Sequence, residues 1–229
     1  MRGRAIVALL FAAVTFTGCG DDDGGPPPAD PLPEASELPG HGGSDQADPG
    51  GLVAPDVEGT AFAPFPSLGF GIAVPEGWNA TRLDDEAFER LEDADLAQPF
   101  FLEAARNVAS TGAIFYAAGV DPQGRVAEIK VDVEEGADPS VGAIRAAAEA
   151  EVLAAGGTDV NVVEADDGRV RVDFRLRQPA ADGEETIDAY VSRVLVPDDD
   201  QVWSIVVTSE DAATQSAVLA VVDAGFVLA

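Results

Sequence analysis

Four arginines at alternating positions of one predicted strand are the side chains best suited to binding chemistry: Arg169, Arg171, Arg175 and Arg177. Residues two apart in a strand share a face, so this arginine ladder also includes Asp173. Guanidinium groups hold carboxylates and phosphates through paired hydrogen bonds, so the ladder is a candidate surface for an acidic partner. The alternative is pairing with acids of neighbouring strands, such as Glu164, Asp188 or Glu185.

Two tryptophans form a second candidate binding site. Trp78 and Trp203 could line a ligand pocket, together with Tyr116 or Tyr190. Large aromatic side chains also fill cores and seal the edges between helices and sheets, with their polar atoms hydrogen-bonded. Both interpretations remain open from the sequence.

Residues 60–229 contain neither His nor Cys, which excludes several chemistries from this part of the chain. Catalysis by Ser-His-Asp or Cys-His sets needs an imidazole, and zinc and copper sites use imidazole or thiolate ligands. The only lysine, Lys130, lies among acids, which keep an amine charged and oppose its activation as a nucleophile. We therefore expect no catalytic residue, no cofactor and no metal site.

Carboxylates support two alternative functions, a carboxylate-dependent hydrolase and a calcium-binding surface protein. The acidic clusters do not follow the spacing of a twelve-residue calcium loop. We expect them to be solvated charges at turns and helix caps: Asp84-Asp85-Glu86, Glu92-Asp93-Asp95, Glu134-Glu135, Asp166-Asp167 and Asp198-Asp199-Asp200.

The first 18 residues have the pattern of an export signal. Arg2 and Arg4 precede a short apolar run at 5–13, which is too short to cross a bilayer comfortably and is followed by small residues. Phe16-Thr17-Gly18-Cys19 resembles a bacterial lipobox, with Phe in place of the usual Leu. The pattern predicts that Cys19 carries fatty-acyl chains such as palmitate, which would anchor the protein to the membrane.

Residues 19–59 are predicted to form a disordered acidic tether. Positions 20–59 contain 9 Gly, 8 Pro and 10 acids, with no Lys or Arg. Such a segment cannot bury enough apolar area to offset its chain entropy. His41, flanked by glycines, lies here and is not expected to be catalytic. The whole chain has a formal charge of −29, which argues against nucleic-acid binding.

Residues 60–229 read as one α+β domain, in which hydrophobic periodicity separates strands from helices. Strands are predicted at 70–74, 112–120, 125–134, 160–164, 169–177, 186–196 and 202–208. Helices are predicted from Asp84 or Asp85, around residues 96–108, at 139–155, and after a Ser209 cap to about Asp223 with Ala213 in its buried stripe. Short turns between strands, Asp182-Gly183 among them, imply antiparallel pairing. The prediction is an α-β-α sandwich with a six- to seven-stranded, mainly antiparallel sheet.

Val74-Pro75-Glu76-Gly77-Trp78, directly after the first predicted strand, resembles the entry motif of PsbP-like domains, including the actinobacterial LpqN-type lipoproteins. The end of the chain is similar too: Trp203-Ser204-Ile205-Val206-Val207-Thr208, then a helix, then Gly225-Phe226. The element order agrees over roughly residues 68–229. The resemblance implies a sandwich that acts by binding proteins or ligands, and it carries no catalytic residues.

These observations together predict a non-enzymatic, lipid-anchored lipoprotein on the extracytoplasmic face of the cell membrane. Its PsbP-like domain would bind an envelope protein or a small ligand, as a monomer. The sequence does not identify that partner.

Overall fold

A computed structural model describes residues 52–93, 99–179 and 186–229 and shows a large antiparallel sheet at the centre of the domain. Its strand order is β3-β4-β5-β9-β8-β7-β6. The strands are β3 (Asn79–Arg82), β4 (Phe115–Val120), β5 (Val126–Glu135), β6 (Thr158–Glu164), β7 (Val170–Pro179), β8 (Thr186–Asp198) and β9 (Gln201–Ser209). The seven-stranded antiparallel sheet confirms the predicted α+β class.

A second, three-stranded sheet has the order β1-β2-β10 and is also antiparallel. It contains β1 (Thr60–Phe65), β2 (Phe70–Pro75) and the two-residue β10 (Val227–Leu228), with a short 3-10 turn at Pro66–Leu68 between the first two. The strand predicted at 70–74 therefore exists, but it pairs with the chain's last residues rather than with the large sheet. Leu52, which precedes β1, is buried.

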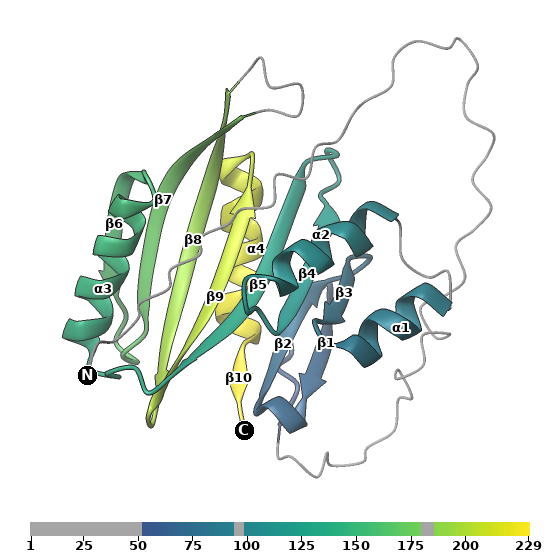
Figure 1. The fold of residues 1–229 in the computed structure, drawn as a ribbon, viewed down its shortest axis with the longest axis horizontal. Helices are drawn as coiled ribbons and strands as arrows, with labels where there is room; N and C mark the ends of the chain where they lie inside the picture. Colours follow the sequence, from purple (N-terminus) through teal and green to yellow (C-terminus); the bar gives the residue numbers. More distant parts are fainter. Residues whose placement is uncertain (1–51, 94–98, 180–185) are drawn as a thin grey trace.

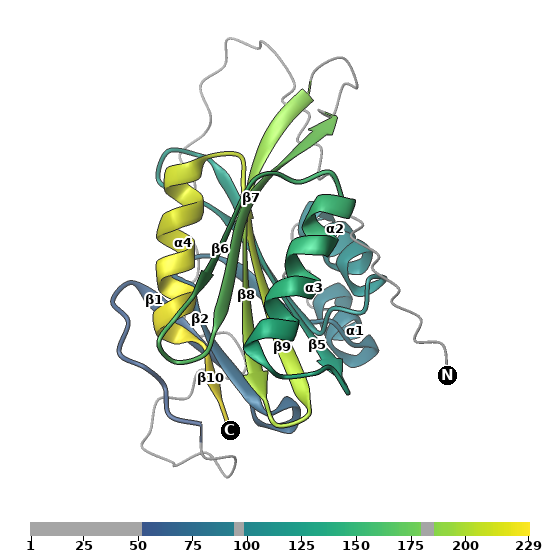
Figure 2. The ribbon, with the colours of Figure 1, turned by 90° about the vertical axis from the view of Figure 1, so that its left-hand side faces the viewer.

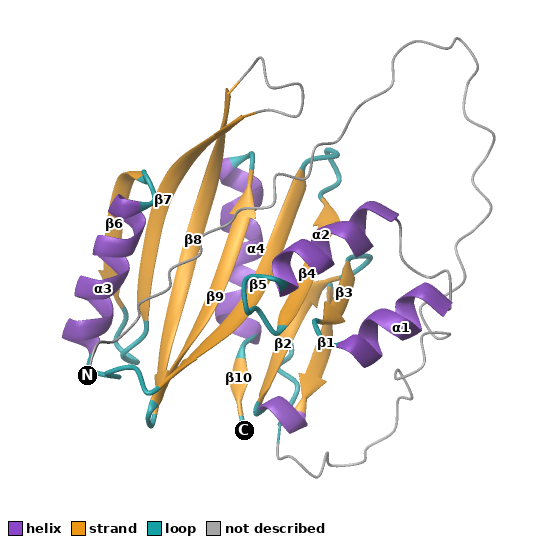
Figure 3. Ribbon diagram, in the orientation of Figure 1, coloured by secondary structure: helices purple, strands orange, loops and turns teal. Residues whose placement is uncertain are grey.

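Four α-helices among the described residues complete a three-layered sandwich (Figures 1 and 3). They are α1 (Asp85–Asp93), α2 (Pro99–Ala109), α3 (Val141–Ala154) and α4 (Ala212–Gly225). Figure 2 shows α1, α2 and α3 on one face of the large sheet, with α4 and the small sheet on the other. We call these the α3 face and the α4 face.

Three hydrophobic clusters hold the layers together. The largest lies between the large sheet and α4 with the small sheet, and includes Phe70, Ile205 and Trp203. A second joins α3 to β7 and β8 through Ile144, Ala148 and Val152. The third and smallest joins α2 to β4. Burial of these apolar surfaces, rather than helix propensity, fixes the helices on the sheet.

The start of α4 differs from the prediction. Ser209 ends β9, where its hydroxyl donates to the Val126 carbonyl, and Asp211 is the N-cap. The Asp211 carboxylate accepts from the amides of Ala213 and Thr214 at 3.1 and 2.9 Å, as an N-cap side chain does. Since the helix begins at Ala212, Ala213 is exposed, contrary to the prediction, and Thr214 is buried instead.

The outer strand of the large sheet, β6, is irregular. Its register with β7 shifts between Thr158 and Asn161, and Asp159 has a left-handed backbone with φ of 54°. Such a bulge bends the strand and interrupts the ladder. The regular part of this edge is therefore limited to residues 161–164.

Candidate ligand-binding surface

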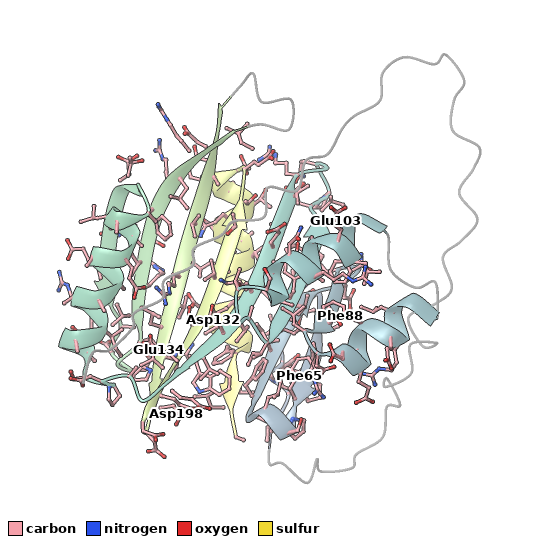
Figure 4. The ribbon with its side chains drawn as sticks, viewed as in Figure 1. Phe65, Phe88, Glu103, Asp132, Glu134 and Asp198 are labelled. Carbon is pink, nitrogen blue, oxygen red and sulfur yellow. The ribbon has the colours of Figure 1, made fainter. Side chains whose placement is uncertain are left out.

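A row of polar side chains crosses the middle of the α3 face, between α3 and α2. Val206 on β9 pairs with Lys130 of β5 on one side and with Arg193 of β8 on the other. Asp132 of β5 pairs with Ser204 of β9. Directly paired residues of an antiparallel sheet point to the same face, so these four side chains lie together. We call Arg193, Ser204, Lys130 and Asp132 the polar strip. Figure 4 shows Asp132 on this face, between α3 and α2.

The charges of the polar strip are half-buried and paired. The Arg193 Nη1 atom lies 2.6 Å from Glu151 Oε2 on α3, and its Nε donates to Ser204 Oγ at 2.9 Å. Lys130 Nζ lies 3.4 Å from Asp132 Oδ2. The side chains of Arg193 and Lys130 are 19% and 26% exposed. A guanidinium has five donors and an ammonium three, so both groups can still donate to a ligand.

The arginine ladder lies on the opposite face, and each of its members pairs with an acid of the same chain. The pairs are Arg169–Asp167 at 3.0 Å, Arg171–Asp173 at 3.1 Å, Arg175–Asp159 at 3.3 Å and Arg177–Asp188 at 3.4 Å. Asp188 is one of the cross-strand partners that the sequence suggested. The Arg175 guanidinium also lies 5.2 Å from the centre of the Tyr190 ring, a cation–π contact.

Three residues of the arginine ladder connect β7 to α4: Arg169, Arg171 and Asp173. Arg169 Nη1 donates to the Asp223 carbonyl at 3.3 Å, near the negative end of the helix dipole. Asp173 accepts from Ser192 Oγ at 2.5 Å, and Ser192 in turn accepts from Gln215 Nε2 of α4 at 2.5 Å. Arg171 and Asp173 therefore belong to a polar network that holds α4 on the sheet.

The two tryptophans lie at opposite ends of the large sheet. Trp203 is 3% exposed in the main core, where its ring centre lies 5.3 Å from that of Phe70. Its Nε1 donates to Asp198 Oδ2 at 3.3 Å. Trp78 is half-buried over Gly119, which pairs with Ala127, whereas Trp203 pairs with Val133. Six residues of β5 separate these rows, or about 20 Å, so the tryptophans do not line a common pocket.

Burial raises the pKa of two carboxyl groups, on opposite faces of the large sheet. Glu128 lies on the α3 face of β5, where the Tyr116 hydroxyl donates to its Oε1 at 2.9 Å and partly offsets the shift. Asp223 lies on α4, where Arg171 and Arg169 counteract the effect of burial. These two acids do not converge on one site. Within the described ranges, no group of three acidic side chains is arranged to hold a metal ion.

Several predicted features lie outside the described residues: the leader, Cys19, most of the tether with His41, residue Leu96 and the Asp182-Gly183 turn. In the described part, no helix is long and apolar enough to cross a membrane. The structure thus leaves the predicted acyl anchor as an expectation from the sequence.

Sequence reasoning missed the polar strip. It noted that Lys130 lies among acids in a predicted strand, but did not connect that strand with Arg193. The available signal was Arg193, the single charged residue in the run from Val191 to Val196. A charged residue facing a sheet centre needs a partner, and its partner here comes from α3, which only the packing reveals.

The fold places the protein in the class of α+β sandwiches. In the described ranges, its large antiparallel sheet carries three helices on one face, and one helix with a small sheet on the other. No protein-family model matches the sequence, and no curated protein matches it either. Among solved structures, it is similar to cyanobacterial PsbP (CyanoP) from Synechocystis sp. PCC 6803, with 10% identity and a TM-score of 0.43 over 76% of this chain and 94% of that one.

It is also similar to a protein of Bacteroides thetaiotaomicron VPI-5482, with 12% identity and a TM-score of 0.41 over 76% of this chain. The match spans about half of that protein, or 49% of its length. Both likenesses concern the arrangement of helices and strands and carry no information about activity.

Proposed function

We propose that this chain is a lipid-anchored envelope protein that binds a protein or small ligand and does not catalyse a reaction. The observation that carries the binding role is the polar strip, a set of half-buried, paired charges on the sheet face between two helices. The lipobox-like Phe16-Thr17-Gly18-Cys19 supports the anchor. On this proposal the domain acts as a monomer outside the cytoplasmic membrane.

The paired charges of the polar strip suit recognition of a polar ligand. Each cation is already neutralised by an acid, so an incoming group can exchange hydrogen bonds without meeting an uncompensated charge. The arginine ladder is the alternative surface, but its guanidinium groups are engaged within the fold. Arg177, with a side chain 79% exposed, is the ladder member most open to a partner.

The anchor is tested by mass spectrometry of the protein from membranes of a bacterial host. We expect the mature chain to begin at Cys19 with acyl chains attached, and Cys19→Ser to release the protein from the membrane fraction. Recovery of unacylated wild-type chain in the soluble fraction would contradict the anchor without bearing on the binding surface.

The binding surface is tested by photo-crosslinking in cells, followed by purification of the protein with its captured partner. Lys130→Glu reverses a charge of the polar strip and should reduce capture several-fold. Arg177→Glu makes the same charge change on the other face and is the matched control. Loss of capture with Arg177→Glu alone would instead identify the arginine ladder as the binding surface.

Lys130 also serves as a reporter, because it is the only lysine in the chain. An amine-acylating reagent should modify its side chain in the free protein, since 26% of it is exposed. A partner bound to the polar strip should protect Lys130 from acylation. Unchanged acylation in the isolated complex would place the partner elsewhere.

A further inference from the structure

Helix α2 is attached to the sheet by the smallest of the three hydrophobic clusters formed by the described residues. Its buried members are Phe101, Ala104, Ala105, Val108, Ala113 and Tyr116. Three of these six are alanines, which bury little area. Helices held by little apolar area are the first to open locally, because stability is not uniform across a fold.

Under α2 lies a tyrosine–carboxylate pair. The Phe101 ring stacks on Tyr116, with ring centres 5.4 Å apart, and Tyr116 is 1% exposed. The Tyr116 hydroxyl donates to Glu128 Oε1 at 2.9 Å. Glu128 is half-buried beside it. Opening of α2 would therefore uncover the Tyr116 side chain and expose the Glu128 carboxylate further to water.

The surroundings of Glu128 offer its negative charge little compensation. On β4 it meets the neutral Tyr116, and on β9 it lies opposite Thr208. Lys130, about 7 Å away along β5, pairs with Asp132 instead. On α2, Glu103 and Arg106 lie on the exposed side. An ionised carboxylate in this position is penalised by burial, and water would relieve the penalty.

We propose that α2 opens from the sheet as a unit, uncovering Tyr116 and exposing Glu128 further to water next to the polar strip, and that the ionised Glu128 favours the open state. Opening extends the accessible polar surface from β5 onto β4. This conformational device does not depend on the proposed function, since it concerns only the packing of α2.

Cysteine labelling measures the opening in the full chain with Cys19→Ser, which removes the only native thiol. Ala105, on the buried side of α2, and Ala148, on the buried side of α3, form a matched pair, because the two residues are 0% and 2% exposed. We expect the Ala105→Cys thiol to react at least about 10-fold faster than the Ala148→Cys thiol, because α2 opens without global unfolding. Adding Glu128→Gln should slow labelling of Ala105→Cys by about 3-fold or more, and should not speed that of Ala148→Cys.

Equal labelling rates at the two sites would overturn the proposal, because both thiols would then react only through global unfolding. An unchanged rate for Ala105→Cys with Glu128→Gln would refute the role of the carboxylate. If either cysteine variant fails to fold, amide hydrogen exchange of residues 101–109 and 141–154, in the wild type and Glu128→Gln, replaces labelling. Faster exchange in α2, slowed by Glu128→Gln, supports the proposal, and equal protection of the two helices contradicts it.

Discussion

Replacing Ser192 by Ala should weaken the attachment of α4 to the large sheet. Ser192 is 1% exposed, donates to the Asp173 carboxylate and accepts from the Gln215 amide, both at 2.5 Å. A hydrogen bond to a charged group contributes about 1.5–3 kcal/mol, and one between neutral groups about 1 kcal/mol. Asp173 is partly exposed and regains water, so we expect a loss of about 2–3 kcal/mol.

Thermal unfolding followed by circular dichroism measures this loss. In a domain of 150–250 residues, 1 kcal/mol shifts the Tm by about 2–4 °C, so Ser192→Ala should lower the Tm by about 4–12 °C. Ser216→Ala is the control, because its exposed hydroxyl donates to the Ala212 carbonyl within α4 at 2.8 Å and lies as far as 3.5 Å from Gln215 Oε1, so its loss should shift stability by less than about 0.5 kcal/mol. A shift for Ser192→Ala no larger than the control's would refute the view that this network holds α4.

Three further predictions concern other parts of the domain. Gly119→Ala should lower stability by about 1–3 kcal/mol in denaturant unfolding, because a Cβ there would collide with the Trp78 indole, whereas Gly142→Ala in α3 meets no atom and should stabilise by up to about 1 kcal/mol. Glu128→Gln should raise the free energy of unfolding at pH 7, because burial raises the pKa of Glu128 and its ionised form is unfavourable in the native state. The difference in unfolding free energy from the wild type should shrink towards pH 4, as the native state takes up the Glu128 proton. A difference that widens on acidification would contradict this. Hydrogen bonds lower the pKa of Asp211 and Asp121, so their contribution to stability is complete above pH 4 and is lost below it; Asp211→Ala should therefore flatten the acid-unfolding curve between pH 4 and 2.

Periodicity was sufficient to predict the long elements of the fold. Alternation in 125–134 and 169–177 identified β5 and β7, and the helical stripe of Ile144, Ala148 and Val152 identified α3. The short strands were missed. Residues 79–82 and 227–228 are too brief for a periodic signal, and they are strands only because β4 and β2 pair with them.

The candidate site was less predictable than the fold. The arginine ladder is visible in the sequence as four alternating bases, yet its role depends on partners 2 to 54 residues away, such as Asp188 and the Asp223 carbonyl. The polar strip depends on the order β5-β9-β8, which joins Lys130 to Arg193 across a strand that lies late in the chain. Strand order is a property of tertiary packing, so local pattern could not reveal it.

The bulge in β6 has a consequence for copies of this protein held close together. A sheet that ended in a straight, unpaired strand would offer its free amides and carbonyls to the next copy, and molecules crowded side by side would join into ribbons. Here the left-handed Asp159 and the bulge leave only residues 161–164 regularly paired, and this stretch ends with the charged Glu164. Lateral growth of the sheet through that edge is therefore discouraged at high density, at the cost of a few ladder hydrogen bonds.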